Sequence, residues 1–287
     1  MQHVPIMVRE TLEYLAIRPD GVYLETTAGL GGHTRAIAER LTTGMVIACD
    51  RDAESLEKAR KNTAHLAGRI RFQHAAFADV RQTLAASGVE QVDGLLADLG
   101  VSRYQLTDPE RGFSLMADGT LDMRMDRSGG TTAADLVNSI SEKELADLIY
   151  RLGEDRRSRK LSRAIVRARP IHTTAQLARV IEKSVPRTGR LHPATQTFMA
   201  LRLAVNGELE QLDRLLADLP TVVAPGGRIV FISFMSLEDR RIKTGFQDMA
   251  RRGRAVILTK HVVRPSQAEV EANPSSRSAK LRAAEMK

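Results

Sequence analysis

Cysteine is almost absent from this sequence, and the other features of a secreted or membrane protein are missing too. The 287 residues include a single cysteine, Cys49, which excludes a disulfide framework and fits a reducing compartment. The N-terminus has no basic region followed by an apolar one, as a signal peptide would. No apolar run approaches the ~20 residues of a membrane span. We therefore expect a cytoplasmic protein without a membrane partner, with Cys49 as a core residue.

Aromatic residues are scarce as well. They make up 4% of the chain and tryptophan is absent, which disfavours an RNA-binding sheet that stacks bases on aromatic rings. The histidines are scattered without the spacing of metal ligands, so we expect no metal site. Apolar residues nevertheless reach 43%, enough to form a core in a chain of this length.

The positive charge is concentrated in two segments. The net charge is +8 overall, but residues 151–190 carry +9 and residues 240–287 carry +8, which leaves about −9 for the remainder. Clusters of arginine and lysine on an otherwise acidic chain favour a polyanionic partner such as RNA or DNA. The alternative is that both segments are solvated helix faces.

Short apolar runs alternate with helical patterns at both ends of the chain. We expect strands at residues 22–27, 45–50, 70–74, 92–99, 227–234 and 255–260. Helical patterns lie between the first four of these runs, which predicts a doubly wound, mostly parallel α/β sheet. Residues 133–217 have a helical pattern throughout. We therefore predict a discontinuous sheet domain, residues 1–104 and 218–287, with an inserted helical domain at 105–217. The last dozen residues fit either a final strand or a disordered tail.

A glycine-rich turn follows the first expected strand, in the sequence E-T-T-A-G-L-G-G-H-T (25–34). Such a turn before a helix can place backbone N–H groups against a polar ligand. Asp50 ends the second strand, where an acidic residue can bind both hydroxyl groups of a ribose. Together they indicate an adenosine-type cofactor, the alternative being a plain turn and a solvated aspartate.

The glycine spacing decides between cofactors. Gly29, Gly31 and Gly32 are followed by His33 and Thr34, so the third glycine of the dinucleotide motif is missing, and no P-loop is present. A cofactor without a pyrophosphate fits better than NAD, which makes a dehydrogenase the weaker alternative. S-adenosylmethionine is the expected cofactor, with its adenine near Phe77.

Several motifs, in order along nearly the whole chain, resemble those of the bacterial small-subunit rRNA (cytosine-N4) methyltransferase family, also called RsmH or MraW. They are H-V-P (3–5), G-L-G-G-H (29–33), D-L-G-V-S-R-Y-Q-L (98–106), E-R-G-F-S (110–114), L-D-M-R-M-D (121–126), H-P-A-T (192–195), I-S-F-M-S-L-E-D-R (232–240) and N-P-S-S-R-S-A-K-L-R (273–282). L-D-M-R-M-D and H-P-A-T are the most specific of these.

The resemblance implies a Rossmann-like class I methyltransferase fold and S-adenosylmethionine as cofactor. It implies methylation of N4 of a cytosine in the decoding centre of 16S rRNA, with the small ribosomal subunit as partner. The implied cofactor contacts are Gly31, Gly32, His33, Asp50, Phe77, Asp98 and Gln105. Asp98 ends the fourth strand and is our candidate for orienting the reacting amine. The target base has to be turned out into the pocket, and the basic inserted domain is expected to hold the RNA.

Other conspicuous residues have structural interpretations. Asp122 and Asp126 are expected to hold a loop through Arg124 or Arg111, and His192 to fix the turn into a long helix. His33 has two interpretations that remain open, a cofactor contact and a helix cap.

The sequence departs from the family pattern in a few places. Glu25 stands where an aspartate is usual, Arg103 where a serine is usual, Thr107 where an aspartate is usual, and Met235 where a histidine is usual. These departures keep open a second hypothesis, an RNA-binding protein that retains the cofactor pocket, has lost catalysis and acts in ribosome assembly.

Overall fold

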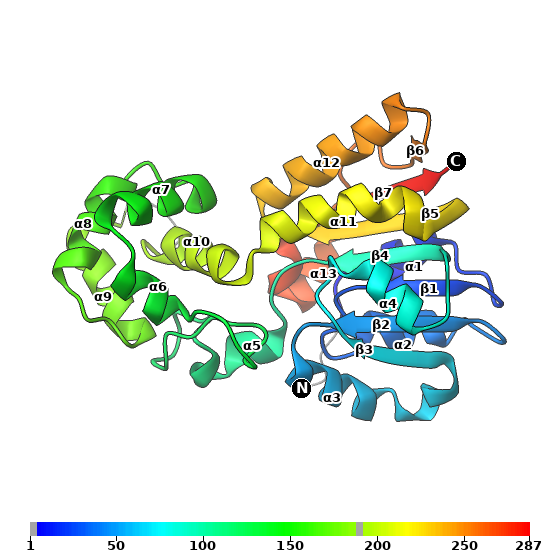
Figure 1. Cartoon of the computed structure of the whole chain (residues 1–287), viewed down its shortest axis with the longest axis horizontal. Coiled ribbons are helices and arrows are strands. Elements are labelled where there is room, and N and C mark those ends of the chain that lie inside the picture. The colour runs from blue at the N-terminus through cyan, green and yellow to red at the C-terminus, as the bar shows by residue number, and fades with distance from the viewer. Residues whose placement is uncertain (1–4, 188–191) are drawn as a thin grey trace. The chain divides into compact units, whose positions relative to one another are not determined.

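The computed structural model describes residues 5–187 and 192–287, which form two compact units (Figure 1). The sheet unit comprises the chain up to Gly100 and from Leu209 onward, and the helical unit runs from Val101 to Glu208. The helical unit ends earlier than the expected limit at residue 217. The reason is that the helix after Glu208 packs Leu212, Leu215 and Leu219 into the core of the sheet unit.

The sheet unit is built on seven strands in the order β3-β2-β1-β4-β5-β7-β6. Their bounds are β1 Val22–Glu25, β2 Met45–Asp50, β3 Ile70–His74, β4 Val92–Asp98, β5 Val223–Ser233, β6 Ala255–Ile257 and β7 Lys280–Met286. The first five strands run parallel, and β7 lies antiparallel between β5 and β6. The prediction of a doubly wound α/β sheet is confirmed, and this strand order with its reversed seventh strand is that of the class I methyltransferase fold.

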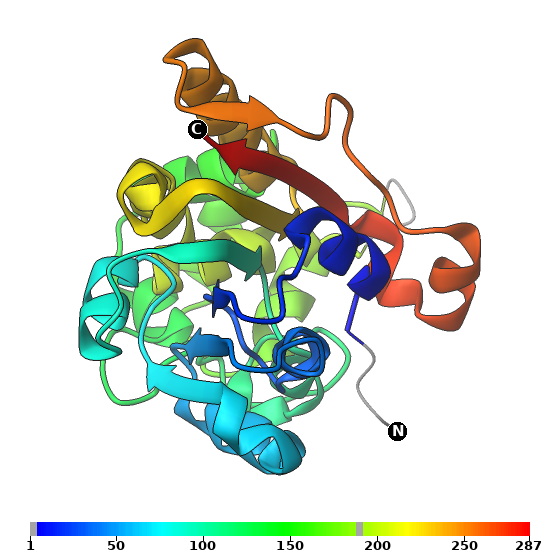
Figure 2. The same cartoon turned by 90° about the vertical axis from the view of Figure 1, so that its right-hand side faces the viewer.

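Helices cover both faces of the sheet, as the end-on view in Figure 2 shows. One face packs against α4 (Val80–Ala86), α11 (Glu208–Val222) and α12 (Ser236–Arg251). The other packs against α1 (Val8–Leu15), α2 (Gly32–Ala38) and α3 (Ala53–Asn62). Successive strand residues point to opposite faces, so Leu24 and Ile47 belong to the first core and Tyr23 and Val46 to the second. This burial on both sides explains why the strands appear in the sequence as continuous apolar runs.

The sheet unit contains two elements that the sequence analysis left open or did not predict. The last residues form the strand β7, which settles the choice between strand and tail. A short helix, α13 (Gln267–Ala272), precedes it.

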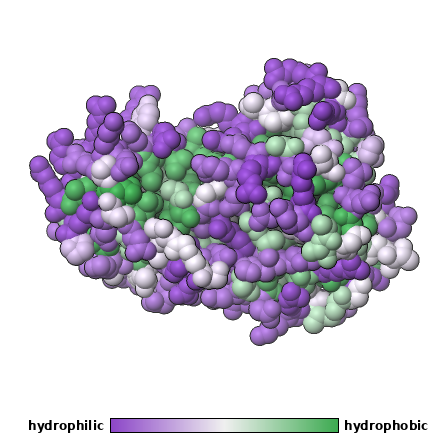
Figure 3. Space-filling view, in the orientation of Figure 1, coloured by the Kyte–Doolittle hydropathy of each residue, from purple (hydrophilic) through white to green (hydrophobic). Residues whose placement is uncertain are grey.

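Hydrophilic residues cover most of the face shown in Figure 3. Within the described residues, no helix is both long and apolar enough to cross a bilayer.

The helical unit has its own core. Its helices are α5 (Arg103–Thr107), α6 (Ala133–Ser139), α7 (Glu142–Gly153), α8 (Ser158–Arg167), α9 (Thr174–Ser184) and α10 (Thr195–Asn206). Reciprocal capping starts α6, α7 and α9, where the side chains of Thr132, Ser141 and Thr173 accept hydrogen bonds from the backbone three residues on. The short helix α5 starts in the same way, since the Ser102 side chain accepts a hydrogen bond from the Gln105 N–H.

Candidate functional site

Three carboxylic acids lie at the carboxyl ends of neighbouring strands in the sheet unit. Glu25 ends β1, Asp50 ends β2 and Asp98 ends β4. These strands pair in parallel, so their carboxyl ends lie at one edge of the sheet, which is where such folds bind ligands. Among the described residues, no three His, Cys, Asp or Glu side chains are placed to hold a metal ion. The edge is therefore acidic.

Glu25 is the most buried of the three acids, with 1% of its surface exposed. Burial raises the pKa of its carboxyl well above the usual value, a hydrogen bond donated by the Thr34 hydroxyl lowers it, and the charges of Asp98 and Asp50 raise it further. Its Oε1 atom is buried and accepts no hydrogen bond. A buried carboxyl oxygen without a partner is costly, so this atom is available to a donor or cation from a ligand.

Asp50 holds the glycine-rich turn in place. Its Oδ2 accepts a hydrogen bond from the Gly29 N–H at 2.7 Å, and its Oδ1 accepts one from the Asp52 N–H at 2.9 Å. Burial raises the pKa of Asp50 to about 6, although both backbone hydrogen bonds lower it. Each oxygen keeps a second lone pair, so the carboxylate can also accept hydrogen bonds from a ligand.

Two glycines of the turn are required by the fold itself. Gly31 is the N-cap of α2 at φ +82°, a conformation that other residues adopt only at a cost. A Cβ atom on Gly32 would lie 2.9 Å from the Pro5 ring. The close approach that the sequence predicts at this turn is thus made partly by the N-terminal segment of the same chain.

The pKa of Asp98 lies close to neutrality. Burial, followed by the charge of Glu238, raises the pKa of Asp98 to about 7. Its backbone N–H donates to the Thr27 hydroxyl at 2.7 Å. Its side chain is 24% exposed overall, but its Oδ1 atom is buried and accepts no hydrogen bond. A carboxyl group with these properties can gain or lose a proton at physiological pH.

His33 connects Asp98 to the N-terminal segment. Its ring is 4% exposed, with Nε2 2.9 Å from the Ile6 carbonyl oxygen and Nδ1 3.7 Å from Asp98 Oδ2. Because a carbonyl only accepts hydrogen bonds, Nε2 carries the proton. The next residue, Met7, donates its N–H to Glu269 Oε1 of α13 at 2.6 Å. The ring is therefore fixed from two sides, through contacts that the sequence analysis did not anticipate.

Glu238 is a further acid that the sequence analysis missed. It lies in the first turn of α12, is 2% exposed, and its Oε2 accepts hydrogen bonds from the N–H groups of Phe234 and Met235. A glutamate three residues into a helix is a known capping signal. Met235, which replaces the usual histidine, is the buried N-cap of this helix.

The two remaining predicted cofactor residues have local structural roles. Phe77 lies in the turn before α4 and is buried in the core with Val80 and Leu84. Gln105 belongs to the helical unit, where its Oε1 accepts the Ser102 N–H at 2.8 Å. The departures Arg103 and Thr107 are exposed positions of the same short helix.

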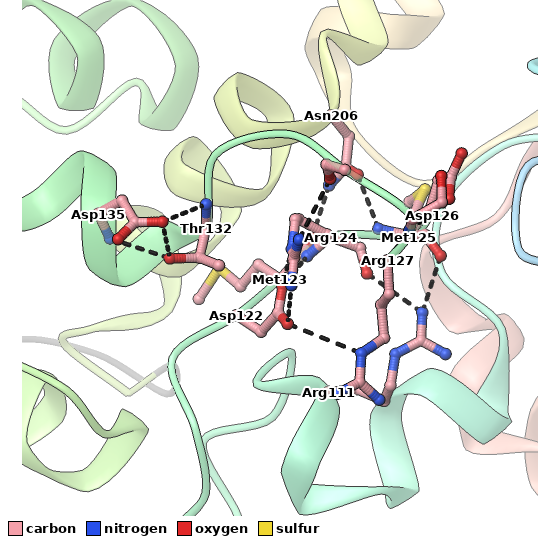
Figure 4. A network of polar contacts seen from close by, with 12 residues as sticks. Arg111, Asp122, Met123, Arg124, Met125, Asp126, Arg127, Thr132, Asp135 and Asn206 are labelled. Atoms are coloured by element: carbon pink, nitrogen blue, oxygen red, sulfur yellow. Dashed lines mark hydrogen bonds and ion pairs between the residues drawn. The ribbon is translucent and has the colours of Figure 1, made fainter.

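The L-D-M-R-M-D segment of the helical unit forms a polar network around a buried arginine (Figure 4). Arg111 is fully buried and its Nη2 donates to the carbonyl oxygens of Arg124 and Met125. Asp122 accepts two hydrogen bonds from the Arg124 guanidinium, at 2.7 and 2.9 Å, and one from the Arg124 N–H at 3.1 Å. The expected structural pairing of Asp122 with Arg124 is confirmed, and Arg111 holds the backbone of the same segment.

Asn206, at the end of α10, ties this segment to the helices of the same unit. Its Oδ1 accepts the Met125 N–H at 2.9 Å, and its Nδ2 donates to the carbonyl oxygens of Met123 and Arg202 at 2.8 and 2.9 Å. Met123 has a φ of +61°, so the turn depends on such bonds to hold it. His192 has a comparable role, because its Nδ1 accepts the Ala194 N–H just before α10.

Replacing Asn206 by alanine is expected to lower the free energy of unfolding by about 2–4 kcal/mol, because the Met125 N–H and the Met123 carbonyl lose their buried partner. Asn206→Asp is expected to cost at least as much, since it buries a carboxylate against the carbonyl oxygens of Met123 and Arg202. Urea unfolding followed by circular dichroism measures both. A loss below about 0.5 kcal/mol for the alanine variant would show that the network is not structural.

A family model and curated relatives match the chain from one end to the other. The model of the MraW methylase family matches residues 1–287. The chain is 61% identical to a protein of Solibacter usitatus named ribosomal RNA small subunit methyltransferase H, over 99% of this chain and 100% of the relative. It is 48% identical to a protein of the same name from Koribacter versatilis, over 99% and 94% of the two chains. The crystal structure of an rRNA methylase from Streptococcus thermophilus aligns over 99% of both chains, with a TM-score of 0.48 and 9% identity.

Proposed function

The chain belongs to the MraW methylase family, and from that premise we propose that it methylates N4 of a cytosine in the decoding centre of small-subunit rRNA, with S-adenosylmethionine as the methyl donor. Membership of this family and the names of the relatives support methyl transfer to rRNA. The proposal goes further, because it specifies a cytosine, its N4 atom and the decoding centre.

The buried carboxyl oxygens at the strand ends are the observation that carries the cofactor assignment. S-adenosylmethionine has two cationic groups, an ammonium and a sulfonium, and one negative carboxylate. Glu25 Oε1 and Asp98 Oδ1 are both buried without a hydrogen-bond partner, and the carboxyl groups of Asp50 and Asp98 both raise the pKa of Glu25. A cationic ligand relieves this repulsion, since an opposite charge nearby favours the ionised carboxylate.

We assign the following contacts on that basis. Asp50 accepts hydrogen bonds from the ribose hydroxyls, and the turn through Gly31 and Gly32 holds the methionyl end. His33 is held by its contact with the Ile6 carbonyl oxygen and helps to orient the Asp98 carboxyl group. Phe77, toward the adenine, completes the set proposed within the sheet unit, and a cofactor contact of Gln105 stays a prediction that the family resemblance implies.

The chemistry requires an amine to be positioned and a proton to be removed. When bound, the cofactor supplies an electrophilic methyl group on its sulfonium. The exocyclic amine of cytosine is a poor nucleophile because its lone pair is delocalised into the ring. Asp98 would accept a hydrogen bond from this amine and take the proton that the nitrogen loses as its new N–C bond forms. The pKa of about 7 for Asp98 suits this role at physiological pH.

Methyl transfer from labelled S-adenosylmethionine to small ribosomal subunits tests the proposal. The subunits come from a strain that lacks this gene, and nucleosides are analysed by mass spectrometry. We expect N4-methylcytidine. Methylation of another base or atom would overturn the N4 assignment. Binding of cofactor and subunit without transfer would favour the noncatalytic RNA-binding hypothesis, and Met235→His would then be tested for recovered activity.

Cofactor binding is expected to release protons near neutral pH. In the free protein the pKa values of Asp50 and Asp98 are about 6 and about 7, and a bound cation lowers both. The affinity for S-adenosylmethionine should therefore rise with pH between about 5 and 7. Calorimetry in buffers of different ionisation enthalpy measures the released protons directly. Zero release at pH 6.5, with a dissociation constant unaffected by pH, would exclude a carboxylate site for the cationic groups.

A further inference from the structure

The two basic segments of the sequence differ in how the fold pairs their charges. Within residues 240–287, arginines form ion pairs with aspartates of the sheet unit. These pairs are Arg241–Asp213 at 3.2 Å, Arg251–Asp248 at 3.4 Å, Arg252–Asp248 at 2.9 Å and Arg282–Asp239 at 2.6 Å. At least four of the segment's twelve Lys and Arg side chains are thus ion-paired within the fold.

The basic segment of the helical unit is arranged differently, along α8. Arg159, Lys160, Arg163 and Arg167 are all exposed, and their spacing of three and four residues places them on one face of the helix. The opposite face buries Leu161 and Ile165. From Arg156 to Ile181 the sequence contains no aspartate or glutamate.

Most of these cations have no acidic partner. Arg163 lies 3.4 Å from Glu142 of α7. For Arg159, Lys160 and Arg167, the part of the chain that the structure describes offers no carboxylate within ion-pairing distance. We call these four exposed side chains the α8 basic face. Exposed like charges repel one another along a helix, so the arrangement favours an external polyanion.

We propose that the α8 basic face binds consecutive phosphates of the RNA backbone; the identity of this RNA as small-subunit rRNA rests on the proposed function. From Arg159 to Arg167 the face is about 12 Å long, sufficient for several phosphates of one strand. The face carries no aromatic residue, so it contributes affinity and orientation and does not read bases.

The same helix is poorly suited to a membrane surface. A helix that lies on a bilayer inserts its apolar face among the lipids. Here Leu161 and Ile165 are fully buried in the core of the helical unit. The exposed side of α8 therefore offers charge alone, as backbone recognition of nucleic acid requires.

The test is a triple variant, Arg159→Gln with Lys160→Gln and Arg167→Gln, whose positions are exposed and whose replacements favour helix. Its charge-matched control is Arg241→Gln and Arg251→Gln in α12 with Arg252→Gln at the C-cap of that helix. Binding to transcribed small-subunit rRNA is measured between 50 and 300 mM salt, and circular dichroism confirms the fold. We expect the triple variant to bind on the order of tenfold to hundredfold more weakly. The slope of log K against log salt should fall by about 2 to 3, with cofactor affinity unchanged and the control close to wild type.

The possible outcomes separate this inference from the proposed function. A triple variant with wild-type affinity and salt slope, or a control that loses as much as the triple variant, would overturn the assignment of the α8 basic face. If the wild-type protein binds RNA through this face but transfers no methyl group, the proposed function fails and the surface assignment stands. If the wild-type protein methylates its subunit and the triple variant only raises KM, both stand.

Discussion

The Asp98→Asn variant is expected to transfer methyl groups 10²- to 10⁴-fold more slowly at saturating substrate, the usual range for a lost general base. Asparagine keeps the size of the side chain but does not accept the proton from the amine. Because Glu25 and Asp50 remain, the dissociation constant for S-adenosylmethionine should change by less than about tenfold. Single-turnover kinetics with small subunits, together with calorimetry for the cofactor, separate these two effects.

Asp93→Asn is the matched control for this experiment. Asp93 lies on the same strand, β4, but at its amino end, where it accepts hydrogen bonds from Arg18 and the Val22 N–H. Its variant should retain wild-type turnover. The pH profile adds a second readout: bound cofactor lowers the pKa of Asp98, so kcat should rise with pH below about 7, and this rise should disappear only in the Asp98 variant. A kcat within about threefold of wild type for Asp98→Asn would remove Asp98 from the chemistry and leave it a binding role.

The Asp50→Ala variant is expected to bind S-adenosylmethionine about a hundredfold more weakly. Two hydrogen bonds from ribose hydroxyls to a carboxylate are worth roughly 3 kcal/mol together. Asp52→Asn is the control, because asparagine removes a neighbouring charge yet still caps α3 through the N–H groups of Glu54 and Ser55.

A second ligand separates ribose binding from support of the glycine turn. The cofactor analogue that lacks the 2′-hydroxyl should lose affinity for the wild-type protein but not for the Asp50 variant, as in a double-mutant cycle. If the variant only melts at a lower temperature and discriminates between the two ligands as before, Asp50 serves the turn alone, through its bond to Gly29.

The sequence predicted the parts of the fold that produce local patterns. Strands buried on both faces appear as apolar runs, so the ends of β2 and β4, and with them Asp50 and Asp98, could be placed at one edge of a parallel sheet. The cofactor roles of these residues stay predictions. Helical periodicity, in contrast, marks an apolar face without saying which core receives it. The assignment of α11 to the inserted domain up to residue 217 shows that limit, because Leu212 packs in the sheet unit.

Contacts between residues that are far apart in the chain could not be predicted, because they leave no pattern in the sequence. The bond from Met7 to Glu269 joins residues 262 positions apart, and one backbone donor meeting one carboxylate has no sequence signature. Arginine generally prefers the surface, so residue type alone predicts an exposed Arg111, whereas this residue is fully buried. Glu238 was detectable in principle, because a glutamate at this position of a helix is a capping signal.

The separation of β4 from its partner β5 has a consequence for synthesis on the ribosome. β4 ends at Asp98 and β5 begins at Val223, with the whole helical unit encoded between them. At a translation rate of 5–20 residues per second, on the order of ten seconds pass between the synthesis of β4 and that of β5. During that interval its apolar residues Leu95 and Leu96 form the open edge of an unfinished sheet, which is the kind of strand that pairs with other chains. The nascent protein therefore passes through an aggregation-prone stage that early folding of the helical unit cannot shorten, because only translation of β5 ends it.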